Sequence, residues 1–486
     1  MKILFVSSEM NPLAATGGLG DVVGSLPQVL RQKGHDVRVV LPLYRQIKHD
    51  YFEDLTFMRW AMIKLGWRTM YSGLFRLDLN GLPVYLIDNE FYFGHDNLYI
   101  DYSFDIERFS FFQRAVLETL GAEMDFEPDL LHLNDWQTGM IPVILEAHYK
   151  SKGYHKAVNC VMTIHNLKYQ GIHGREQIQD LFDLPDEYMS EGGVLKDGVP
   201  NFLKSGIQYS NRVTTVSPHY AREIMTDYYG EGLNGLLAAQ GWKVSGILNG
   251  IDTDSYNPET DSELTANYSP QAWKRGKAAC KKALQAELAL AQDPKTPLFV
   301  MVTRLVEQKG LDLLLHIVDE LLEENVQLVI LGTGNHEYEY RLTETAGRYP
   351  DKMRALIRFD GKLARRMYSA GDLYLMPSLF EPCGLSQMIA MRYGTLPIVR
   401  QTGGLADTVQ AYDKFKNTGT GFGFLNINAH ELLFTAKEAI SVYHNNPDAW
   451  NHMVQAAMRS DFSWDKSADE YIKLYEDIMK ETSQID

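Results

Sequence analysis

A glycine-rich octet occurs near both ends of the chain, and both copies have the residue types that bind anions. It reads Thr-Gly-Gly-Leu-Gly-Asp-Val-Val at residues 16–23 and Thr-Gly-Gly-Leu-Ala-Asp-Thr-Val at residues 402–409, so six of the eight positions are identical. Paired glycines let backbone N–H groups approach an anion with no Cβ in the way, and a helix N-terminus adds partial positive charge. The repeat predicts one phosphate-bearing ligand held between two similar halves. Glycines that serve helix packing alone are the alternative, but packing does not explain why the octet occurs twice.

Two cations and a carboxylate follow strand-like runs in the second half. Arg304 comes directly after the apolar run 300–303, and Lys309 precedes a helical pattern. Two cations at such a loop can clamp a diphosphate, whereas ordinary surface positions are the alternative. Glu381 follows the run 373–376. It would accept sugar hydroxyls or balance a developing positive charge, or else stabilise the helix after it through the helix dipole.

Polar residues also end two strand-like runs in the first half. Asp135 follows the run 130–133, and His165 follows the run 158–164. The carboxyl ends of parallel strands are where ligands bind in open α/β sheets. A carboxylate and an imidazole suit a neutral sugar, with Trp136 as a stacking face. A histidine satisfied within the fold is the alternative for His165.

Three other patterns imitate known sites without matching them. Gly18, Gly20 and Gly24 resemble a dinucleotide fingerprint, but ten residues separate them from the strand where the fingerprint needs a tight turn. Gly332-Thr333-Gly334 is a weak match of the same kind. Asp252-Thr253-Asp254 resembles a metal-binding Asp-x-Asp, yet it follows Asn-Gly and is typical of a turn. We therefore expect no nicotinamide cofactor and no metal.

These residues must be positioned by alternating strands and helices in two α/β halves. The hydrophobic pattern predicts buried parallel strands and long helices, with a domain boundary near 245–255. The segment 254–293 is polar and basic and predicts surface helices. The expected strands are 2–6, 37–41, 130–133, 158–164, 212–216, 244–248, 298–303, 327–331, 355–359, 373–376 and 396–399, with helices at 19–33, 106–124 and 464–480.

Charge and composition exclude several classes of partner. The formal net charge is −16 over 486 residues, which disfavours nucleic acid or an anionic membrane as a partner. The three cysteines, Cys160, Cys280 and Cys383, are odd in number and scattered, so we expect a reducing compartment and no disulfide framework. No apolar run approaches the ~18 residues of a membrane span. The expected location is the cytoplasm, or a plastid stroma if a transit peptide was removed.

Beyond these separate features, the chain resembles one known family along nearly its whole length. It is similar to bacterial glycogen synthases and soluble starch synthases, the ADP-glucose-dependent glycosyltransferases of family 5. The resemblance rests on these motifs in this order: SSEMNPLA and TGGLGDVVGSLP within 7–27, NDWQTG at 134–139, TIHNLKYQG at 163–171, TTVSPHYAREI at 214–224, GILNGID at 246–252, TRLVEQKGLDLL at 303–314, PSLFEPCGLSQMIAMRYG at 377–394 and RQTGGLADTV at 400–409.

The resemblance implies a GT-B fold, with two Rossmann-like, doubly wound domains facing across a cleft. Residues 1–248 would form the acceptor-side domain and 249–460 the nucleotide-sugar-binding domain, with 461–486 as a helix that crosses back to the first domain. The implied reaction transfers glucose from ADP-glucose to the non-reducing end of an α-1,4-glucan (glycogen, starch or maltooligosaccharide). It proceeds with retention at the anomeric carbon and with neither a metal nor a cofactor.

The resemblance also assigns roles to matching residues. Arg304 and Lys309 would neutralise the diphosphate, and Glu381 would contact the glucosyl hydroxyls. His165 would lie over the glucose, with its main chain or ring near O6, and Asp135 would bind hydroxyls on the acceptor side. The implied donor-binding positions are Gly17, Gly18, Asn249, Phe359, Cys383, Gly384, Leu385, Thr402, Gly403, Gly404 and Leu405.

The chain departs from the family pattern at two positions. Ala15 stands where the family has Lys before the first glycine pair, so one expected cation is absent. Arg365 stands where the family usually has His, and it is a candidate for replacing that charge. Ala15 is the sequence feature that favours an alternative function, a weakly active or inactive glucan-binding scaffold for initiation. A synthase that uses UDP-glucose or a small acceptor is a third hypothesis.

Overall fold

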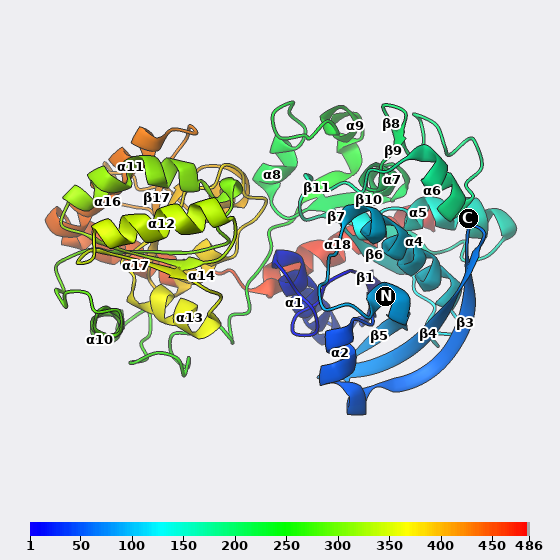
Figure 1. The fold of residues 1–486 in the computed structure, drawn as a ribbon, viewed down its shortest axis with the longest axis horizontal. Coiled ribbons are helices and arrows are strands. Elements are labelled where there is room, and N and C mark those ends of the chain that lie inside the picture. The colour runs from blue at the N-terminus through cyan, green and yellow to red at the C-terminus, as the bar shows by residue number, and fades with distance from the viewer. Residues whose placement is uncertain (484–486) are drawn as a thin grey trace. The chain divides into compact units, whose positions relative to one another are not determined.

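Two sheets, one mixed and one wholly parallel, organise the chain in the computed structural model, which describes residues 1–483 (Figure 1). The chain forms two compact units, the first from Met1–Ile247 together with the chain from Trp464 on, and the second from Leu248–Ser463. Each unit is built around its own buried sheet with helices on both faces. This confirms the predicted two-domain α/β architecture.

The first unit contains a nine-stranded sheet in the order β11-β10-β7-β6-β1-β2-β5-β4-β3. All neighbouring pairs from β11 to β5 are parallel, and the β5-β4-β3 end is antiparallel. A turn at Asn80-Gly81 joins β4 and β5, and both residues have positive φ. The strands are β1 Lys2–Val6, β2 Asp36–Pro42, β3 Thr56–Leu65, β4 Arg68–Leu79, β5 Leu82–Asp88, β6 Leu130–Asn134, β7 Asn159–Ile164, β10 Arg212–Thr215 and β11 Val244–Gly246.

Helices connect these strands, as right-handed parallel crossovers require. A small separate hairpin, β8 Leu195–Lys196 and β9 Val199–Pro200, lies between two of them. The helices of the first unit are α1 Gly18–Gln32, α2 Arg45–Asp50, α3 Glu90–Phe93, α4 Tyr102–Thr119, α5 Ile141–Ile144, α6 Arg175–Phe182, α7 Phe202–Tyr209, α8 Pro218–Glu223, α9 Asn234–Ala239 and α18 Trp464–Thr482.

The second unit contains a six-stranded, wholly parallel sheet in the order β14-β13-β12-β15-β16-β17. Its strands are β12 Leu298–Val302, β13 Gln327–Gly332, β14 Met353–Ile357, β15 Leu373–Met376, β16 Leu396–Arg400 and β17 Phe422–Phe424. Its helices are α10 Trp273–Glu287, α11 Leu311–Glu323, α12 His336–Arg348, α13 Gly361–Ala370, α14 Ser386–Arg392, α15 Gly403–Thr408, α16 Ala429–Asn445 and α17 Pro447–Arg459.

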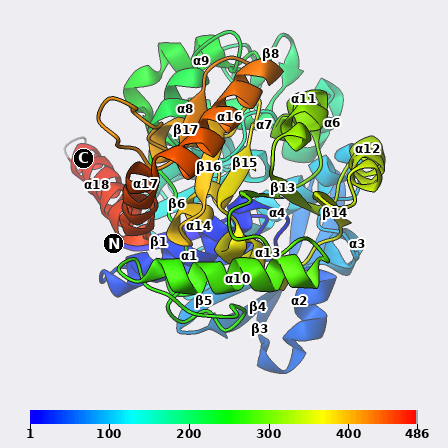
Figure 2. The ribbon, with the colours of Figure 1, turned by 90° about the vertical axis from the view of Figure 1, so that its left-hand side faces the viewer.

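The segment 254–293 confirms the expectation of surface helices only in part. Residues 249–272 are mostly irregular, and the one long helix, α10, lies beside α13 (Figure 2). Two of its basic residues, Lys277 and Lys281, are buried. The Nζ of Lys277 donates hydrogen bonds to carbonyls of Ser369 and Tyr393, and burial lowers its pKa to about 7. The basic residues of this segment therefore include buried lysines that bond the interior as well as exposed surface residues.

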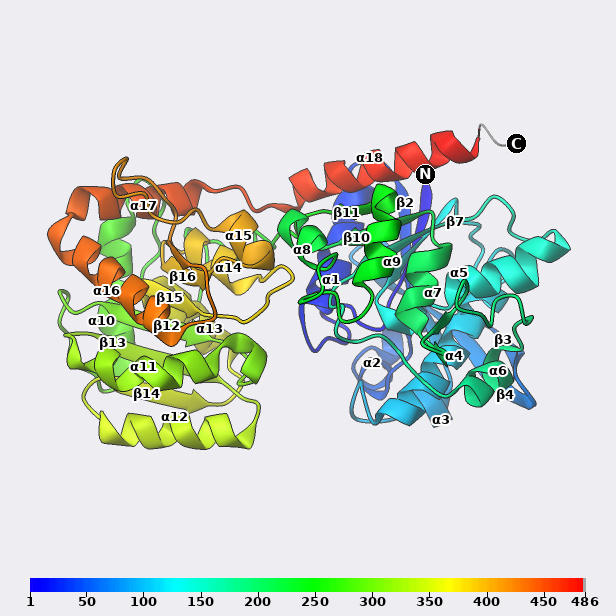
Figure 3. The same ribbon diagram turned by 90° about the horizontal axis from the view of Figure 1, so that it is seen from above.

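The last helix, α18, belongs to the first unit, as the resemblance implied (Figure 3). Its buried Tyr475 hydroxyl lies 2.6 Å from Nδ1 of His132 in β6, and the other ring nitrogen of His132 lies 2.6 Å from the hydroxyl of Thr163 in β7. Burial lowers the pKa of His132 to about 3. A neutral histidine thus joins α18 to the centre of the first sheet. Within residues 1–483, no helix is long and apolar enough to cross a membrane.

Candidate active site

The strand order places the candidate residues at one topological position in each sheet. In the first unit β1 lies between β2 and β6, and in the second β12 lies between β13 and β15. At such points the connections leave the sheet in opposite directions, and ligands bind outside the carboxyl ends of the strands. The loops after β1 and β6 carry Thr16 and Asp135. The loops after β12 and β15 carry Lys309 and Glu381.

In the second unit, Lys309 and Glu381 form a buried ion pair. The Nζ of Lys309 lies 2.6 Å from Oε2 of Glu381, and the side chains are 13% and 8% exposed. The hydroxyl of Ser378 donates to the same oxygen at 3.0 Å. Glu381 is therefore neither a helix cap nor at an exposed loop tip. Sequence reasoning missed Ser378, which precedes Glu381 by three residues.

Hydrogen bonds to its backbone hold the loop of Glu381 between the end of β16 and the loop after β12. The buried guanidinium of Arg400, at the end of β16, donates to carbonyls of Ser378 and Leu379. From the other side, the amide of Leu379 donates to the carbonyl of Gln308 at 2.8 Å. The carboxylate of Glu381 is thus positioned by groups from three strand ends.

The second glycine pair supports this loop by close packing. Gly403 has φ +45°, and a Cβ there would lie 1.9 Å from the carbonyl oxygen of Glu381. A Cβ on Gly404 would lie 2.1 Å from that of Cys383, and the Gly404 amide donates to the Glu381 carbonyl at 3.1 Å. Thr402 and Leu405 on either side are fully buried. In this loop, the packing alternative accounts for both glycines.

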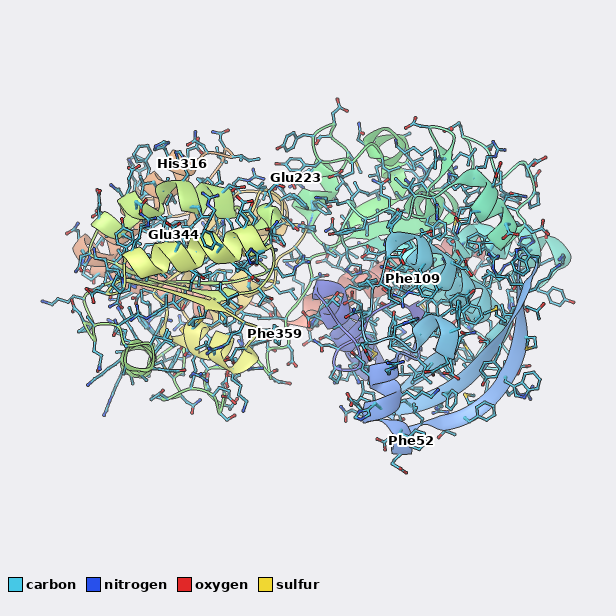
Figure 4. The ribbon with its side chains drawn as sticks, in the orientation of Figure 1. Phe52, Phe109, Glu223, His316, Glu344 and Phe359 are labelled. Carbon is cyan, nitrogen blue, oxygen red and sulfur yellow. The ribbon has the colours of Figure 1, made fainter. Side chains whose placement is uncertain are left out.

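Two further candidates, Arg304 and Phe359, are exposed at strand ends of the same sheet. Arg304 follows β12, and across the described chain its guanidinium makes no hydrogen bond or ion pair. Phe359 follows β14 and is 94% exposed, in the loop before α13 (Figure 4). Both side chains are available to a ligand without breaking an existing contact.

Asn249 and Cys383 contact each other, but only Asn249 has a side-chain atom that is available to bind a ligand. The Asn249 backbone N–H donates to the Cys383 thiol, and burial raises the pKa of that thiol to about 12, so the cysteine is not nucleophilic. The Oδ1 of Asn249 is buried without a hydrogen-bond partner among the described residues. Buried polar atoms are normally paired, so this oxygen is available to a ligand donor. Gly384 (φ +73°) and Leu385 then lead into α14.

In the first unit, Asp135 and His165 are brought together at adjacent strand ends. The Oδ1 of Asp135 accepts the His165 amide at 2.7 Å. Desolvation outweighs this hydrogen bond, and the pKa of Asp135 rises to about 7. Asp135 has φ +55°, an uncommon conformation for a residue with a side chain. The strain and the raised pKa are typical of a functional carboxyl.

The ring of His165 is neutral, and its neighbours determine its tautomer. Burial lowers its pKa to about 3. Asn134 donates its amide N–H groups to carbonyls of Val6 and His132, so its Oδ1 is the atom that accepts from Nε2 of His165 at 2.9 Å. The proton therefore resides on Nε2. Nδ1 is left as an acceptor, suited to a sugar hydroxyl.

The first glycine loop differs from the second in its surroundings. Residues 15–18 are exposed, and a Cβ on Gly17 would meet nothing within 4 Å. Thr16 is held by Glu9, a buried carboxylate that sequence reasoning missed. The sequence feature that could have pointed to Glu9 is its position as the one charged residue in segment 7–15, directly after β1. The two octets are therefore alike in sequence and unlike in environment.

Arg365 lies in a structural cluster of the second unit. Its guanidinium is 3.1 Å from Oδ2 of Asp261, donates to Ser255, and lies over the ring of Tyr256 at 4.4 Å. Asp261 also accepts from the Tyr393 hydroxyl. These contacts fasten the irregular segment 249–272 to α13. The charge of Arg365 is already paired there, so it does not replace the cation missing at Ala15.

Comparisons with known proteins agree with this arrangement. A family model described as the starch synthase catalytic domain matches residues 2–239, and one described as glycosyl transferases group 1 matches residues 286–457. A glycogen synthase of Exiguobacterium sibiricum is 46% identical over 477 residues, covering 98% of each chain. One of Clostridium novyi is 47% identical, covering 99% of each.

Solved structures give the same result. The catalytic domain of starch synthase IV from Arabidopsis thaliana, bound to ADP and acarbose, matches with a TM-score of 0.91 and 34% identity over 99% of both chains. A sucrose-phosphate synthase from Thermosynechococcus elongatus matches with a TM-score of 0.63 and 17% identity, which shows a shared fold alone.

Fold and strand-end residues together define a GT-B glycosyltransferase with two Rossmann-like domains. The chain belongs to the glycogen and starch synthase family, enzymes that transfer glucose in glucan elongation. The scaffold alternative is not favoured by these relationships.

Proposed function

We propose that the donor is ADP-glucose, and that glucose passes to the non-reducing end of an α-1,4-glucan with retention of configuration. The observation that carries this proposal is the Lys309–Glu381 pair at the switch point of the second sheet, where Arg304 begins the same loop as Lys309. The Arabidopsis starch synthase is bound to ADP and acarbose, which supports a nucleoside diphosphate and a glucan-like molecule as ligands of this chain.

In the proposed reaction, two cations stabilise the leaving diphosphate. Arg304 has an exposed guanidinium for bidentate contact with phosphate oxygens. Lys309 shares its charge between Glu381 and the phosphate. With these cations in place, leaving-group charge is balanced by the chain itself, and we propose that no metal takes part. Among residues 1–483, no group of three or more potential ligands could hold a metal ion.

Glu381 and Asn249 orient the glucosyl group in this proposal. The carboxylate of Glu381 accepts ring hydroxyls, and its charge balances the positive charge that develops at the anomeric carbon. The buried Oδ1 of Asn249, which no described residue contacts by a hydrogen bond, accepts a further hydroxyl, and Phe359 offers a face to adenine. Preorganised charges of this kind cost no reorganisation at the moment of reaction.

The acceptor sugar needs no strong protein base in this mechanism. The departing phosphate takes the acceptor proton on the face it leaves, so the chain mainly positions and stabilises. Asp135 binds acceptor hydroxyls, and Nδ1 of His165 accepts from the hydroxyl at O6 of glucose. The high pKa of Asp135 matters because only its ionised form is a pure acceptor.

One assay tests the donor and the reaction together. Labelled ADP-glucose or UDP-glucose is offered with glycogen, with maltooligosaccharide, or with no primer, and incorporation into polymer is measured. We expect incorporation from ADP-glucose with either primer. Incorporation from UDP-glucose alone would contradict the donor assignment, and glucan binding without incorporation would favour the scaffold alternative.

A further inference from the structure

Glu9 is a buried carboxylate with three hydrogen bonds, two of them to a single residue of the first glycine loop. Its Oε2 accepts the Thr16 amide at 2.6 Å, and its Oε1 accepts the Thr16 hydroxyl at 2.8 Å. Oε1 also accepts the Tyr99 hydroxyl at 2.6 Å. Glu9 is 4% exposed, whereas Thr16 is exposed. A buried anion thus fixes the base of an exposed loop.

Tyr99 fixes the carboxylate in turn. Its hydroxyl lies 3.1 Å from that of Ser8 and 3.4 Å from Nε2 of Gln137, which belongs to the turn after Asp135. Burial and the adjacent carboxylate raise the pKa of Tyr99 well above its usual range, so the hydroxyl keeps its proton and donates a hydrogen bond to Glu9. The network links the loop after β1 to the turn after β6.

Backbone hydrogen bonds hold the flanks of the loop, between Met10 and Ala14 and from the Gly20 amide to the Gly17 carbonyl, but none of those described involves residue 15 or 16. Gly17, the residue before α1, makes no side-chain cap, and the space around it is open. The side chain of Ala15 can neither donate nor accept a hydrogen bond. Glu9 therefore supplies the two side-chain hydrogen bonds that restrain residues 15–17.

We propose that Glu9 is a positioning residue, which holds the Thr16–Gly18 loop in the conformation that binds the donor. The proposal rests on the proposed function, with Gly17 and Gly18 as the donor-binding positions that the resemblance implies. Because both hydrogen-bond donors of Thr16 are committed to Glu9, Thr16 donates no hydrogen bond to the nucleotide sugar, whose contacts in this loop we assign to Gly17 and Gly18. Glu9 itself touches no substrate.

A graded set of variants tests this role. Glu9→Gln keeps size and shape but loses one of its two acceptor oxygens, so we expect the donor KM to rise at least about tenfold (about 1.4 kcal/mol) with the glucan KM unchanged. Thr16→Val removes the hydroxyl contact alone and should have a smaller effect. Thr16→Ser keeps both donors and should restore wild-type kinetics.

Amide hydrogen exchange supplies a readout independent of activity. The Thr16 amide is protected by Glu9 despite its exposure, so exchange in a peptide spanning residues 10–19 should be faster in Glu9→Gln and unchanged in Thr16→Ser. Asp36→Asn, at an ion pair of the same unit away from the loop, is the matched control for loss of a carboxylate.

The outcomes separate the two proposals. If the wild-type protein incorporates no glucose from ADP-glucose, the proposed function is wrong. If it does, and Glu9→Gln has the wild-type donor KM, the positioning role is wrong. A parallel rise of both KM values with a lowered unfolding temperature would also overturn it, since that result indicates general destabilisation.

Discussion

The ammonium of Lys309 lies 2.6 Å from the carboxylate of Glu381, although the two residues are 72 positions apart in the chain. Both are largely buried, so neither charge is neutralised by bulk water. Removal of one partner from such a pair leaves the other charge uncompensated, which costs more than an exposed ion pair contributes. The two side chains therefore act as one unit, and either substitution perturbs both.

Lys309→Ala is expected to abolish most transfer while glucan binding survives. Loss of about 2–4 kcal/mol of transition-state stabilisation slows turnover by about 30- to 1000-fold. Turnover with saturating ADP-glucose and binding to immobilised glycogen are the two measurements. Lys416→Ala removes an exposed lysine of the same unit and is the control. Near-normal turnover in Lys309→Ala would contradict the diphosphate role.

Gly403→Ala and Gly17→Ala should differ strongly, although both change the first glycine of the same octet. At Gly403 the new Cβ meets the Glu381 carbonyl at 1.9 Å in a left-handed conformation, whereas at Gly17 it meets nothing. We expect Gly403→Ala to lower the free energy of unfolding by about 2 kcal/mol or more and Gly17→Ala to change it by less than about 0.5 kcal/mol. Denaturant unfolding measures both, and equal effects would show that the loops share one environment.

The rate of transfer should rise with pH through the titration of Asp135. Its pKa of about 7 means that the acceptor-only, ionised form develops between about pH 6 and pH 8. His165 stays neutral over this range because its pKa is about 3. The measurement is kcat/KM for the glucan against pH, which reports the free enzyme. Asp135→Asn should remove this inflection, and an unchanged profile in that variant would assign it to another group.

The raised pKa of Asp135 also predicts that the stability of the folded protein depends on pH. Between about pH 4 and pH 7 the folded protein holds a proton on Asp135 that the unfolded chain has released, so this residue's contribution to stability falls as pH rises. Asp135→Asn should be relatively more stable than the wild type at pH 8 than at pH 4, as measured by urea unfolding at both values.

Ala15→Lys should strengthen donor binding if the first loop contacts the diphosphate. Ala15 is exposed, and an exposed charge pair contributes at most about 1 kcal/mol, so we expect the ADP-glucose KM to fall by up to about fivefold at low salt. Ala14 is buried and unsuitable as a control, whereas Thr56→Lys, at an exposed position of β3 in the same unit, tests a general charge effect. An unchanged KM in Ala15→Lys would show that the loop does not reach the phosphate.

Tyr475→Phe should destabilise the first unit without altering catalysis. It removes the hydroxyl that bonds His132 and leaves a buried ring nitrogen unpaired, at a cost of about 1–3 kcal/mol. Urea unfolding and steady-state kinetics are the two measurements. Lys473→Ala changes an exposed residue on the same helix and should be neutral. A loss of turnover at unchanged stability would contradict this purely structural role.

Local pattern predicted most strands, because buried parallel strands are short apolar runs that end in polar residues. Helix ends were less accurate: the helix expected at 106–124 is Tyr102–Thr119, because Asp101 caps it at its start. The expectation of surface helices at 254–293 was confirmed for α10 alone, whose Lys274, Arg275 and Lys282 are exposed, whereas Lys277 on the same helix bonds buried carbonyls far along the chain.

By itself, the sequence determined the two-domain architecture, the family and the strand ends that carry the candidate residues, since these depend on periodicity and on motifs written in consecutive residues. Only the tertiary structure decided which residues meet: Lys309 with Glu381, Glu9 with Thr16, and Arg365 with Asp261. It also made corresponding glycines of two nearly identical octets different, since Gly403 is tightly packed and Gly17 lies in open space. The physical reason is that contact, burial and charge pairing arise between distant segments, which no local pattern encodes.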